Sequence, residues 1–558
     1  MKQIIQSYKT GQMEIVDVPI PPCGDNGVLV QTTYSLISAG TEKMLIDIAK
    51  KSMIGKAKAR PDLVKQVLNK IKKEGLIPTV QKVLTKLEVP IPLGYSCAGN
   101  VLLTGRNIKG IQSGDRVACA GAGFANHAEI NVVPKNLMVR IPENVTDEQA
   151  AFTTVASIAL QGVRQCNPTI GEKIAVIGTG LIGLITVQLL KANGCDVLAL
   201  DIDSDKLKLA KSFGADVVAN STDTIASAES FSKGIGVDAV IITASSSSKQ
   251  IISDAGAISR MKGRVIMVGM IPIDIPRDIY YKKELDFRMS MSYGPGRYDP
   301  SYETGGQDYP LPYVRWTEQR NMETILNLIS QGRLDVDSLI SHRFDFENVF
   351  DAYKVINGET NEPYLAVILK YDTTQIQKSS ITIQKSEKNE DGKVSIGFIG
   401  AGNFAQSVLF PNITKLDCIL HTLVESNTVN FAVVTKKYKI LNMSSNIDEM
   451  LENKEINTVF ITTPHQMHSH QVIRALNAGK HVFVEKPLAI SEDELIEVKS
   501  TYEKSQRQLM VGYNRRFSPH ARKIRERLDQ VSTPLVMNYI VNAGKIPMDH
   551  WIQDPQFG

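Results

Sequence analysis

The sequence has few of the features that mark secreted proteins, proteins with structural zinc sites or membrane-spanning proteins. Its few cysteines are scattered and form no C-x-x-C pair: Cys23, Cys97, Cys119, Cys166, Cys195 and Cys418. This usage indicates a reducing compartment, with neither a disulfide framework nor a zinc ribbon. No apolar run of signal-peptide length opens the chain, and the longest apolar stretch, 174–190, is interrupted by glycine and polar residues. We therefore expect a cytoplasmic protein without a membrane segment.

An excess of charge of one sign is also absent. The net charge is +4 over 558 residues, which argues against a dedicated nucleic-acid binder. The exception is a lysine-rich segment whose apolar residues recur at helical spacing. We interpret 48–89 as a basic helical insertion. We expect its lysines to form a solvated helical face. The alternative interpretation is an arm that binds a polyanion or a membrane surface.

The length predicts two or three domains, because one hydrophobic core cannot organise 558 residues. The polar segment 372–392, rich in Ser, Thr, Lys and Gln, is typical of a linker. An α/β pattern lies on each side of it, and each pattern contains its own glycine fingerprint.

The first fingerprint, G-x-G-x-x-G, follows an apolar strand and opens a helix. Its glycines allow a tight turn, a close approach of pyrophosphate to backbone N–H groups, and tight packing of helix on strand. Asp201 ends the next strand, where a carboxylate accepts ribose hydroxyls and repels a 2′-phosphate, so we expect NAD. The alternative is a structural turn. The candidate cofactor-binding residues are Gly178, Gly180, Leu181, Ile182, Gly183 and Asp201.

The second fingerprint ends in alanine in place of the third glycine. Glu425 closes its second strand and could hold the ribose, whereas Ser426 and Asn427 would tolerate a phosphate. The cofactor of this half stays open between NAD and NADP. The candidate residues are Gly400, Gly402, Asn403, Phe404, Ala405 and Glu425.

The first half, about 13–370, resembles the medium-chain dehydrogenase/reductase superfamily. The landmarks are GDRVACAG at 114–121, VVPKNLMVRIPENVTDEQAA and GTGLIG. The resemblance implies a GroES-like catalytic domain over 1–145 and 290–371, and an NAD-binding Rossmann domain over 146–289.

The positions of the family's catalytic zinc ligands hold no zinc donors. Ala39 and Tyr95 replace two of them, and the third region, 152–155, has neither Cys nor Asp. We therefore expect no zinc and no other metal. Thr41 and Tyr95 are the candidate proton donors to a developing alkoxide, although Thr41 could be a turn hydroxyl and Tyr95 a core tyrosine. The aromatic, Arg-rich segment 292–320 could line the binding site of a hydroxylated ligand, or it could form a subunit or domain interface.

The second half, from Val394, resembles the Gfo/Idh/MocA oxidoreductase family. Its most specific stretch is INTVFITTPHQMHSHQVIRALNAGKHVFVEKPLA. The resemblance implies a nicotinamide pocket with cofactor contacts from Thr463, Pro464 and Glu485, and with Lys486 and His468 as catalytic residues. An ammonium at Lys486 could orient a substrate hydroxyl and share its proton. The alternative for Lys486 is a structural ion pair with Glu485, and His468 could only shape the pocket.

The expected fold is therefore α/β: a GroES-like β domain plus a Rossmann domain, followed by a second Rossmann domain over 393–515. The remainder, 516–558, is interpreted as the start of an incomplete substrate domain in a C-terminally truncated copy. The expected function is an NAD(P)-dependent oxidoreductase on a sugar-like alcohol, ketone or sugar nucleotide, in a homo-oligomer, with no nucleic-acid or membrane partner. The alternative is a non-catalytic dinucleotide-binding scaffold or a partly inactive truncated bidomain protein.

Overall fold

The computed structural model describes residues 1–52, 89–375, 378–384 and 392–540, with a few positions between 55 and 87 and positions 546 and 553. Most of the basic insertion expected at 48–89, and the end of the segment expected at 516–558, lie outside the described residues. No helix in the described ranges combines the length and the apolar composition that a membrane crossing requires.

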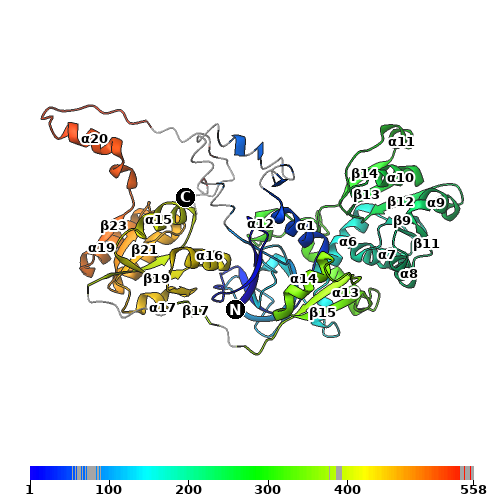
Figure 1. The fold of residues 1–558 in the computed structure, drawn as a ribbon, viewed down its shortest axis with the longest axis horizontal. Helices are drawn as coiled ribbons and strands as arrows, with labels where there is room; N and C mark the ends of the chain where they lie inside the picture. Colours follow the sequence, from blue (N-terminus) through cyan, green and yellow to red (C-terminus); the bar gives the residue numbers. More distant parts are fainter. Residues whose placement is uncertain are drawn as a thin grey trace. The chain divides into compact units, whose positions relative to one another are not determined.

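The chain divides into two compact units, which are described separately (Figure 1). The first unit contains 1–16, 23–66 and 90–376. The second unit contains 17–22, 67–89 and 377–558.

A mainly antiparallel β domain is formed by the beginning and the end of the first unit. Its main sheet has the order β15-β16-β3-β5-β6-β8, with β7 also paired to β3, and a smaller sheet has the order β2-β1-β4. The chain returns to this domain at β16, which pairs antiparallel with β3. The strands are β1 (Lys2–Gln6), β2 (Met13–Asp17), β3 (Gly27–Ile37), β4 (Ile91–Pro92), β5 (Ser96–Thr104), β6 (Arg116–Ala120), β7 (Ile130–Pro134), β8 (Met138–Arg140), β15 (Ile340–Asp345) and β16 (Ala366–Lys370).

A parallel sheet with the order β11-β10-β9-β12-β13-β14 forms the middle of the first unit. Its strands are β9 (Lys173–Ile177), β10 (Asp196–Asp201), β11 (Val217–Asn220), β12 (Val237–Ile242), β13 (Ser259–Met267) and β14 (Asp286–Met289). The helices of the unit are α1 (Ala39–Lys50), α5 (Asp147–Ala150), α6 (Thr153–Cys166), α7 (Leu181–Ala192), α8 (Ser204–Ser212), α9 (Thr224–Ser232), α10 (Gln250–Ile258), α11 (Arg277–Lys282), α12 (Pro300–Glu303), α13 (Glu318–Ser330) and α14 (Val349–Asn357).

The central strand β9 shows why this segment forms a buried parallel strand. Its sequence KIAVI is almost entirely apolar, and the residues from Ile174 to Ile177 are buried. Such continuous burial is expected where helices cover both faces of a sheet. The strand lies between β10 and β12, so the connections that leave its end diverge to opposite sides. This topological switch point is where ligands bind in open parallel sheets.

The second unit repeats the arrangement with the order β17-β20-β19-β18-β21-β22-β23. Its strands are β17 (Ser380–Thr382), β18 (Val394–Ile399), β19 (Cys418–Val424), β20 (Asn442–Ser444), β21 (Thr458–Ile461), β22 (His481–Val484) and β23 (Leu509–Val511). Its helical segments are the π-helical turn η5 (Ala405–Leu409), α15 (Phe410–Ile413), α16 (Thr428–Tyr438), α17 (Ile447–Glu452), η6 (His465–Met467), α18 (His468–Asn477), α19 (Glu492–Ser505) and α20 (Pro519–Leu528).

Strand β17 lies inside the segment 372–392, whose composition predicts a linker. It pairs antiparallel with β20, and the register joins Ser380 to Ser444 and Thr382 to Asn442. The other strands of this sheet are parallel to their neighbours. An edge strand needs only one ladder and can face solvent, so a polar composition does not prevent it. The predicted fold class, two Rossmann sheets and a GroES-like β domain, is confirmed.

Candidate cofactor and active sites

The first glycine loop has no room for larger side chains at two of its three glycines. Gly178 follows β9 with a φ of +96°, and a Cβ there would lie 2.7 Å from the backbone N of Ala244. A Cβ on Gly183 would lie 1.9 Å from Gly178 O. Gly180 faces open space and precedes α7, whose first residues, Leu181 and Ile182, have backbone N–H groups free of helical partners. The loop therefore fits a pyrophosphate at a helix N-terminus.

The Asp201 carboxylate lies beside this loop at the end of β10. Thr179 donates to its Oδ2 from the backbone N at 2.5 Å and from Oγ1 at 2.9 Å. Ile202 N and Asp203 N donate to Oδ1 at 2.7 and 3.0 Å. These donors hold the half-exposed carboxylate next to the loop, where a ribose would follow the pyrophosphate.

The second loop reproduces the same contacts with different residues. Ala401 N donates to Glu425 Oε2 at 2.8 Å, and Ser426 N donates to Oε1 at 2.9 Å. The Thr462 hydroxyl donates to Gly400 O at 2.7 Å, as the Thr243 hydroxyl does to Gly178 O at 2.6 Å. The two loops are therefore built alike, and Glu425 takes the place of Asp201.

The helical turn that follows the second loop differs from the turn that follows the first loop. Gly402 is open, since a Cβ there would approach only Thr462 O, at 4.0 Å. Asn403 is exposed and Phe404 is half-buried. Ala405 is buried to 1 % exposure and begins the π-helical turn η5. Alanine thus stands in place of the third glycine and adds only a methyl group at this buried position.

The predicted nicotinamide-side residues follow β21 and β22, which are adjacent strands. Thr463 donates from Oγ1 to Gln471 Oε1 at 2.6 Å, and Pro464 precedes η6. Burial raises the pKa of the Glu485 carboxyl, while the backbone N–H and the charge of Lys486 lower it. Lys486 itself is exposed, and no ion pair with Glu485 within 4.0 Å is found between these two described residues.

His468 is placed to position its neighbours. It has 0 % exposure, and its ring nitrogens face two backbone carbonyls: Nδ1 lies 2.6 Å from Pro487 O and Nε2 lies 2.8 Å from Thr463 O. Carbonyls only accept, so the ring ties the turn after β21 to the turn that carries Lys486. His465 follows Pro464, where the resembled family commonly has Asn, and its pKa is lowered by burial and by the charges of Lys486 and His468.

Tyr95 and Thr41 meet in the first unit around a third hydroxyl that sequence reasoning missed. The Tyr95 hydroxyl donates to Ser38 Oγ at 2.6 Å. Thr41 lies in the first turn of α1, which Ser38 precedes. Burial raises the pKa of Tyr95, hydrogen bonds with Ser38 and Thr41 lower it, and the charge of Glu42 raises it. The two predicted proton donors are thus brought together.

The segment 292–320 contributes Tyr293 and Glu318 to the same region. Tyr293 is 2 % exposed and Glu318 is 0 % exposed. Within the described part of the chain, neither the Tyr293 hydroxyl nor either Glu318 carboxyl oxygen has a hydrogen-bond partner. Burial raises the pKa of Tyr293, and the charges of Glu318 and Tyr95 add to this, which places the three groups near one another.

Burial also acts on Glu318. It raises the pKa of this carboxyl to about 9, the charge of Glu303 acts in the same direction, and Arg297 opposes them. A neutral carboxyl can donate a hydrogen bond as well as accept one. No pattern of residue types around Glu318 indicates a neutral, hydrogen-bond-donating carboxyl, because this property depends on burial. Of the other aromatics, Tyr302 is fully buried with Tyr309 stacked on it, and the charge of Glu318 acts on Tyr302 as well. Tyr298 and Tyr313 are exposed, and Trp316 stacks with Arg164 and Arg315.

Two family models match the chain. A model described as "Oxidoreductase family, NAD-binding Rossmann fold" (Gfo/Idh/MocA) matches residues 394–513. A model described as "Zinc-binding dehydrogenase" matches residues 182–304. The chain joins a medium-chain dehydrogenase module to a Gfo/Idh/MocA module. It is a bidomain dehydrogenase.

Curated relatives match the first module of the bidomain dehydrogenase. The uncharacterized zinc-type alcohol dehydrogenase-like protein YdjJ of Escherichia coli K12 is 24% identical over 47% of this chain and 78% of its own length. Sorbitol dehydrogenase 1 of Saccharomyces cerevisiae is 25% identical over 48% of this chain and 78% of its own length. D-xylulose reductase of Scheffersomyces stipitis is 25% identical over 50% of this chain and 81% of its own length.

Solved structures show the same fold at low identity. The 2R,3R-butanediol dehydrogenase of Bacillus subtilis is 18% identical with a TM-score of 0.50, and the match covers 66% of this chain and 99% of that one. An alcohol dehydrogenase of E. coli CFT073, solved with NADH, is 22% identical with a TM-score of 0.50, and the match again covers 66% and 99%.

A catalytic zinc does not fit the bidomain dehydrogenase at the family's ligand positions. Ala39 has no donor atom, the Tyr95 hydroxyl bonds Ser38, and Phe152 and Thr153 offer no thiolate, imidazole or carboxylate. Zinc sites need three such ligands. Among the described residues, no group of three or more His, Cys, Asp or Glu side chains could hold a metal ion. The expectation of a zinc-free site stays a prediction, although the matching family model is named for zinc.

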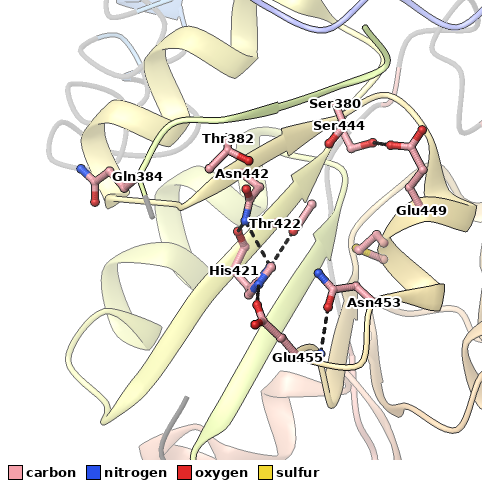
Figure 2. Close-up of a pocket in the computed structure, with 11 residues that line it drawn as sticks. Ser380, Thr382, Gln384, His421, Thr422, Asn442, Ser444, Glu449, Asn453 and Glu455 are labelled. Atoms are coloured by element: carbon pink, nitrogen blue, oxygen red, sulfur yellow. Dashed lines mark hydrogen bonds and ion pairs between the residues drawn. The ribbon is translucent and has the colours of Figure 1, made fainter. Parts of the chain in front are cut away.

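Two cavities of the bidomain dehydrogenase involve neither glycine loop. One of about 480 Å³ lies in the second unit beside β17, β19 and β20 (Figure 2). Its side chains bond mainly to one another: His421 contacts Thr422 at 2.8 Å and Glu455 at 3.0 Å. The other, of about 550 Å³, lies in the first unit and is lined in part by Tyr371 and Asp372. Unlike these cavities, the glycine loops present helix N-termini at a switch point, where ligands bind in open parallel sheets.

Proposed function

We propose that the first unit transfers hydride between NAD(H) and an alcohol or ketone of a sugar-like substrate, without zinc. The observation that carries the proposal is the hydroxyl cluster of Tyr95, Ser38 and Thr41. One of its members, Tyr95, stands at a sequence position where the family holds a metal ligand, and the cluster can donate hydrogen bonds to a carbonyl oxygen. Stabilising the developing alkoxide in this way is general acid catalysis. The dinucleotide supplies the hydride when it is bound.

The substrate class is supported by the names of the curated relatives. Relatives of the first module include proteins named sorbitol dehydrogenase and D-xylulose reductase. A sugar nucleotide belongs to the same chemical class. We propose a hydroxylated carbohydrate as the substrate.

For the second unit, we propose a second dinucleotide and a hydride-transfer site around Lys486. Glu425 supports NAD, and the open Ser426 and Asn427 backbone region leaves space for NADP. The Lys486 side chain is exposed just after β22, and His468 fixes the turn that carries it. Lys486 would orient a substrate hydroxyl and share its proton.

The first test follows NADH oxidation with a panel of D-xylulose, D-fructose and a nucleotide-linked keto sugar, with and without a zinc chelator. Tyr95→Phe should lower kcat by about 100-fold or more, because it removes the proton donor and keeps the ring. Tyr313→Phe is the matched control, since Tyr313 is 89% exposed. Activity that the chelator abolishes and zinc restores would overturn the proposal. Dinucleotide binding with no turnover of any substrate would favour the non-catalytic scaffold.

A further inference from the structure

A continuous set of buried hydrogen-bonding side chains leads inward from the 550 Å³ cavity toward the Tyr95 cluster. Tyr371, which lines this cavity, lies 2.8 Å from Ser35 Oγ, hydroxyl to hydroxyl. Ser35 Oγ lies 2.8 Å from His127 Nδ1, and His127 Nε2 lies 3.2 Å from Glu42 Oε2. Ser35 and His127 are 0 % exposed, Glu42 is 1 % exposed and Tyr371 is 5 % exposed. Every one of these groups can pass a proton.

The direction of these hydrogen bonds follows from the chemistry of their acceptors. A carboxylate only accepts, so His127 Nε2 is the donor to Glu42. A neutral imidazole then offers Nδ1 as an acceptor, and the Ser35 hydroxyl donates to it. Ser35 has a single proton, so Tyr371 must donate to Ser35. All three donors therefore point from the cavity toward Glu42.

Glu42 is connected to the candidate active site through Ser38. The Ser38 backbone N donates to Glu42 Oε1 at 2.9 Å, and the Ser38 hydroxyl accepts from Tyr95 at 2.6 Å. Rotation of the Ser38 hydroxyl, or one bridging water, would join the carboxyl to Tyr95. The His127 ring is also held next to this site, because a Cβ on Gly94, the residue before Tyr95, would lie 2.8 Å from the ring.

Packing alone does not require such a series. Buried ionisable groups are costly compared with apolar side chains of similar volume, and this series places a carboxylate and an imidazole between hydroxyls. Tyr353 provides a comparison: its hydroxyl donates to Glu42 Oε2 at 2.5 Å from outside the series. The other titratable groups that face the series are Cys97 and Glu129, beside Tyr371.

We propose that Tyr371, Ser35, His127 and Glu42 form a proton relay that supplies Tyr95 during carbonyl reduction in the first unit. The proposal rests on the proposed function. As hydride reaches the carbonyl carbon, the Tyr95 hydroxyl turns from Ser38 to the substrate oxygen, the Tyr95 O–H bond breaks and the substrate O–H bond forms. Tyr95 then takes the Ser38 proton, and Ser38 is reprotonated through the Glu42 carboxylate, which receives its proton from His127 Nε2. His127 gains a proton at Nδ1 from Ser35, Ser35 from Tyr371, and Tyr371 from water in the cavity, which becomes hydroxide. One passage leaves His127 as the Nδ1–H tautomer, and alcohol oxidation, which moves a proton the opposite way, restores the resting Nε2–H tautomer.

The kinetic test compares Ser35→Ala with Ser259→Ala in the full-length protein, with NADH and D-xylulose as the probe; the Ser259 hydroxyl is 1 % exposed and donates only to Ala255 O in the parallel sheet domain. Each variant removes one buried hydroxyl, but only Ser35 lies on the relay. Ser35→Ala should lower kcat by about 10-fold or more with little change in KM, and the D2O effect on kcat should increase. Ser259→Ala should stay within about twofold of wild type, and thermal unfolding checks that both variants are folded.

A second measurement needs no turnover. Long-range ¹⁵N NMR of histidine-labelled protein, with His127 assigned from His127→Gln, should show the Nε2–H tautomer, and Ser35→Ala should shift its Nδ1 resonance. An Nδ1–H tautomer would overturn the relay. So would wild-type turnover that Ser35→Ala and Tyr371→Phe leave unchanged. Absence of turnover in wild type itself would overturn the proposed function and the relay with it.

Discussion

Glu318 should make the first unit less stable as the pH rises through neutrality. Its carboxyl is 0 % exposed, and burial raises its pKa to about 9 from an ordinary value of 4.5. In this window the folded state keeps the proton and the unfolded state releases it. The unfolded state therefore binds fewer protons, and the free energy of unfolding falls with increasing pH. This is the reverse of the usual behaviour of a carboxylate in an ion pair.

The magnitude follows from the linkage relation. One proton of difference changes the free energy of unfolding by about 1.4 kcal/mol per pH unit, so raising the pH from about 5.5 to about 7.5 should cost about 3 kcal/mol. Glu318→Gln keeps the shape and removes the titration. The variant has its own constant cost from a buried amide, so the slopes with pH are compared and not the absolute stabilities.

The assay uses a tryptophan beside the perturbed residue. Trp316 lies two residues before Glu318, and Trp551 is the other tryptophan of the chain. In a Trp551→Phe background, urea unfolding followed by fluorescence reports on the first unit between about pH 5.5 and about pH 7.5. Wild type should lose stability with pH more steeply than Glu318→Gln. Equal slopes would refute the reasoning, and Glu318 would then be ionised in the folded protein.

Three further outcomes are expected. Asp201→Ser should weaken NADH binding by about 10-fold and narrow the preference over NADPH, since a hydroxyl cannot repel a 2′-phosphate; fluorescence titration measures both, and an unchanged preference would contradict it. Gly180→Asp should reduce the calorimetric stoichiometry from two dinucleotides per chain to one. The neutral variant Gly180→Asn should bind the dinucleotide more tightly than Gly180→Asp, because the position is open and only the negative charge opposes the pyrophosphate. His468→Leu should destabilise the second unit by about 1 kcal/mol or more, because a part-buried carbonyl loses its hydrogen-bond donor; an unchanged melting transition would count against this.

The two cofactor loops could be predicted from the sequence because their geometry is local. A strand, a turn with small residues and a helix N-terminus follow one another within a few residues, and Asp201 and Glu425 lie at the next strand end. Periodicity and glycine spacing carry this information directly. The confirmed fold class follows from the same repeated units.

The remaining site residues depend on contacts between distant segments. Glu318 becomes a neutral acid only because the folded chain buries it near Tyr293. Ser38 acquires its role when Tyr95, far along the chain, reaches its hydroxyl. The family pattern predicts His468 as a catalytic residue, and only the structure shows that both of its ring nitrogens face backbone carbonyls. No local pattern of residue types encodes such distances.

Strand β17 has a practical consequence for any attempt to prepare the second unit alone. Its three residues cover the outer edge of β20, where backbone N–H and C=O groups would otherwise be unpaired. Uncovered edges of this kind template pairing between copies and lead to aggregation. A fragment that begins at Lys393, just after the segment whose composition predicts a linker, would lack β17 and leave this edge of β20 uncovered. A fragment beginning before Lys378 would keep it and should stay monodisperse at higher concentration.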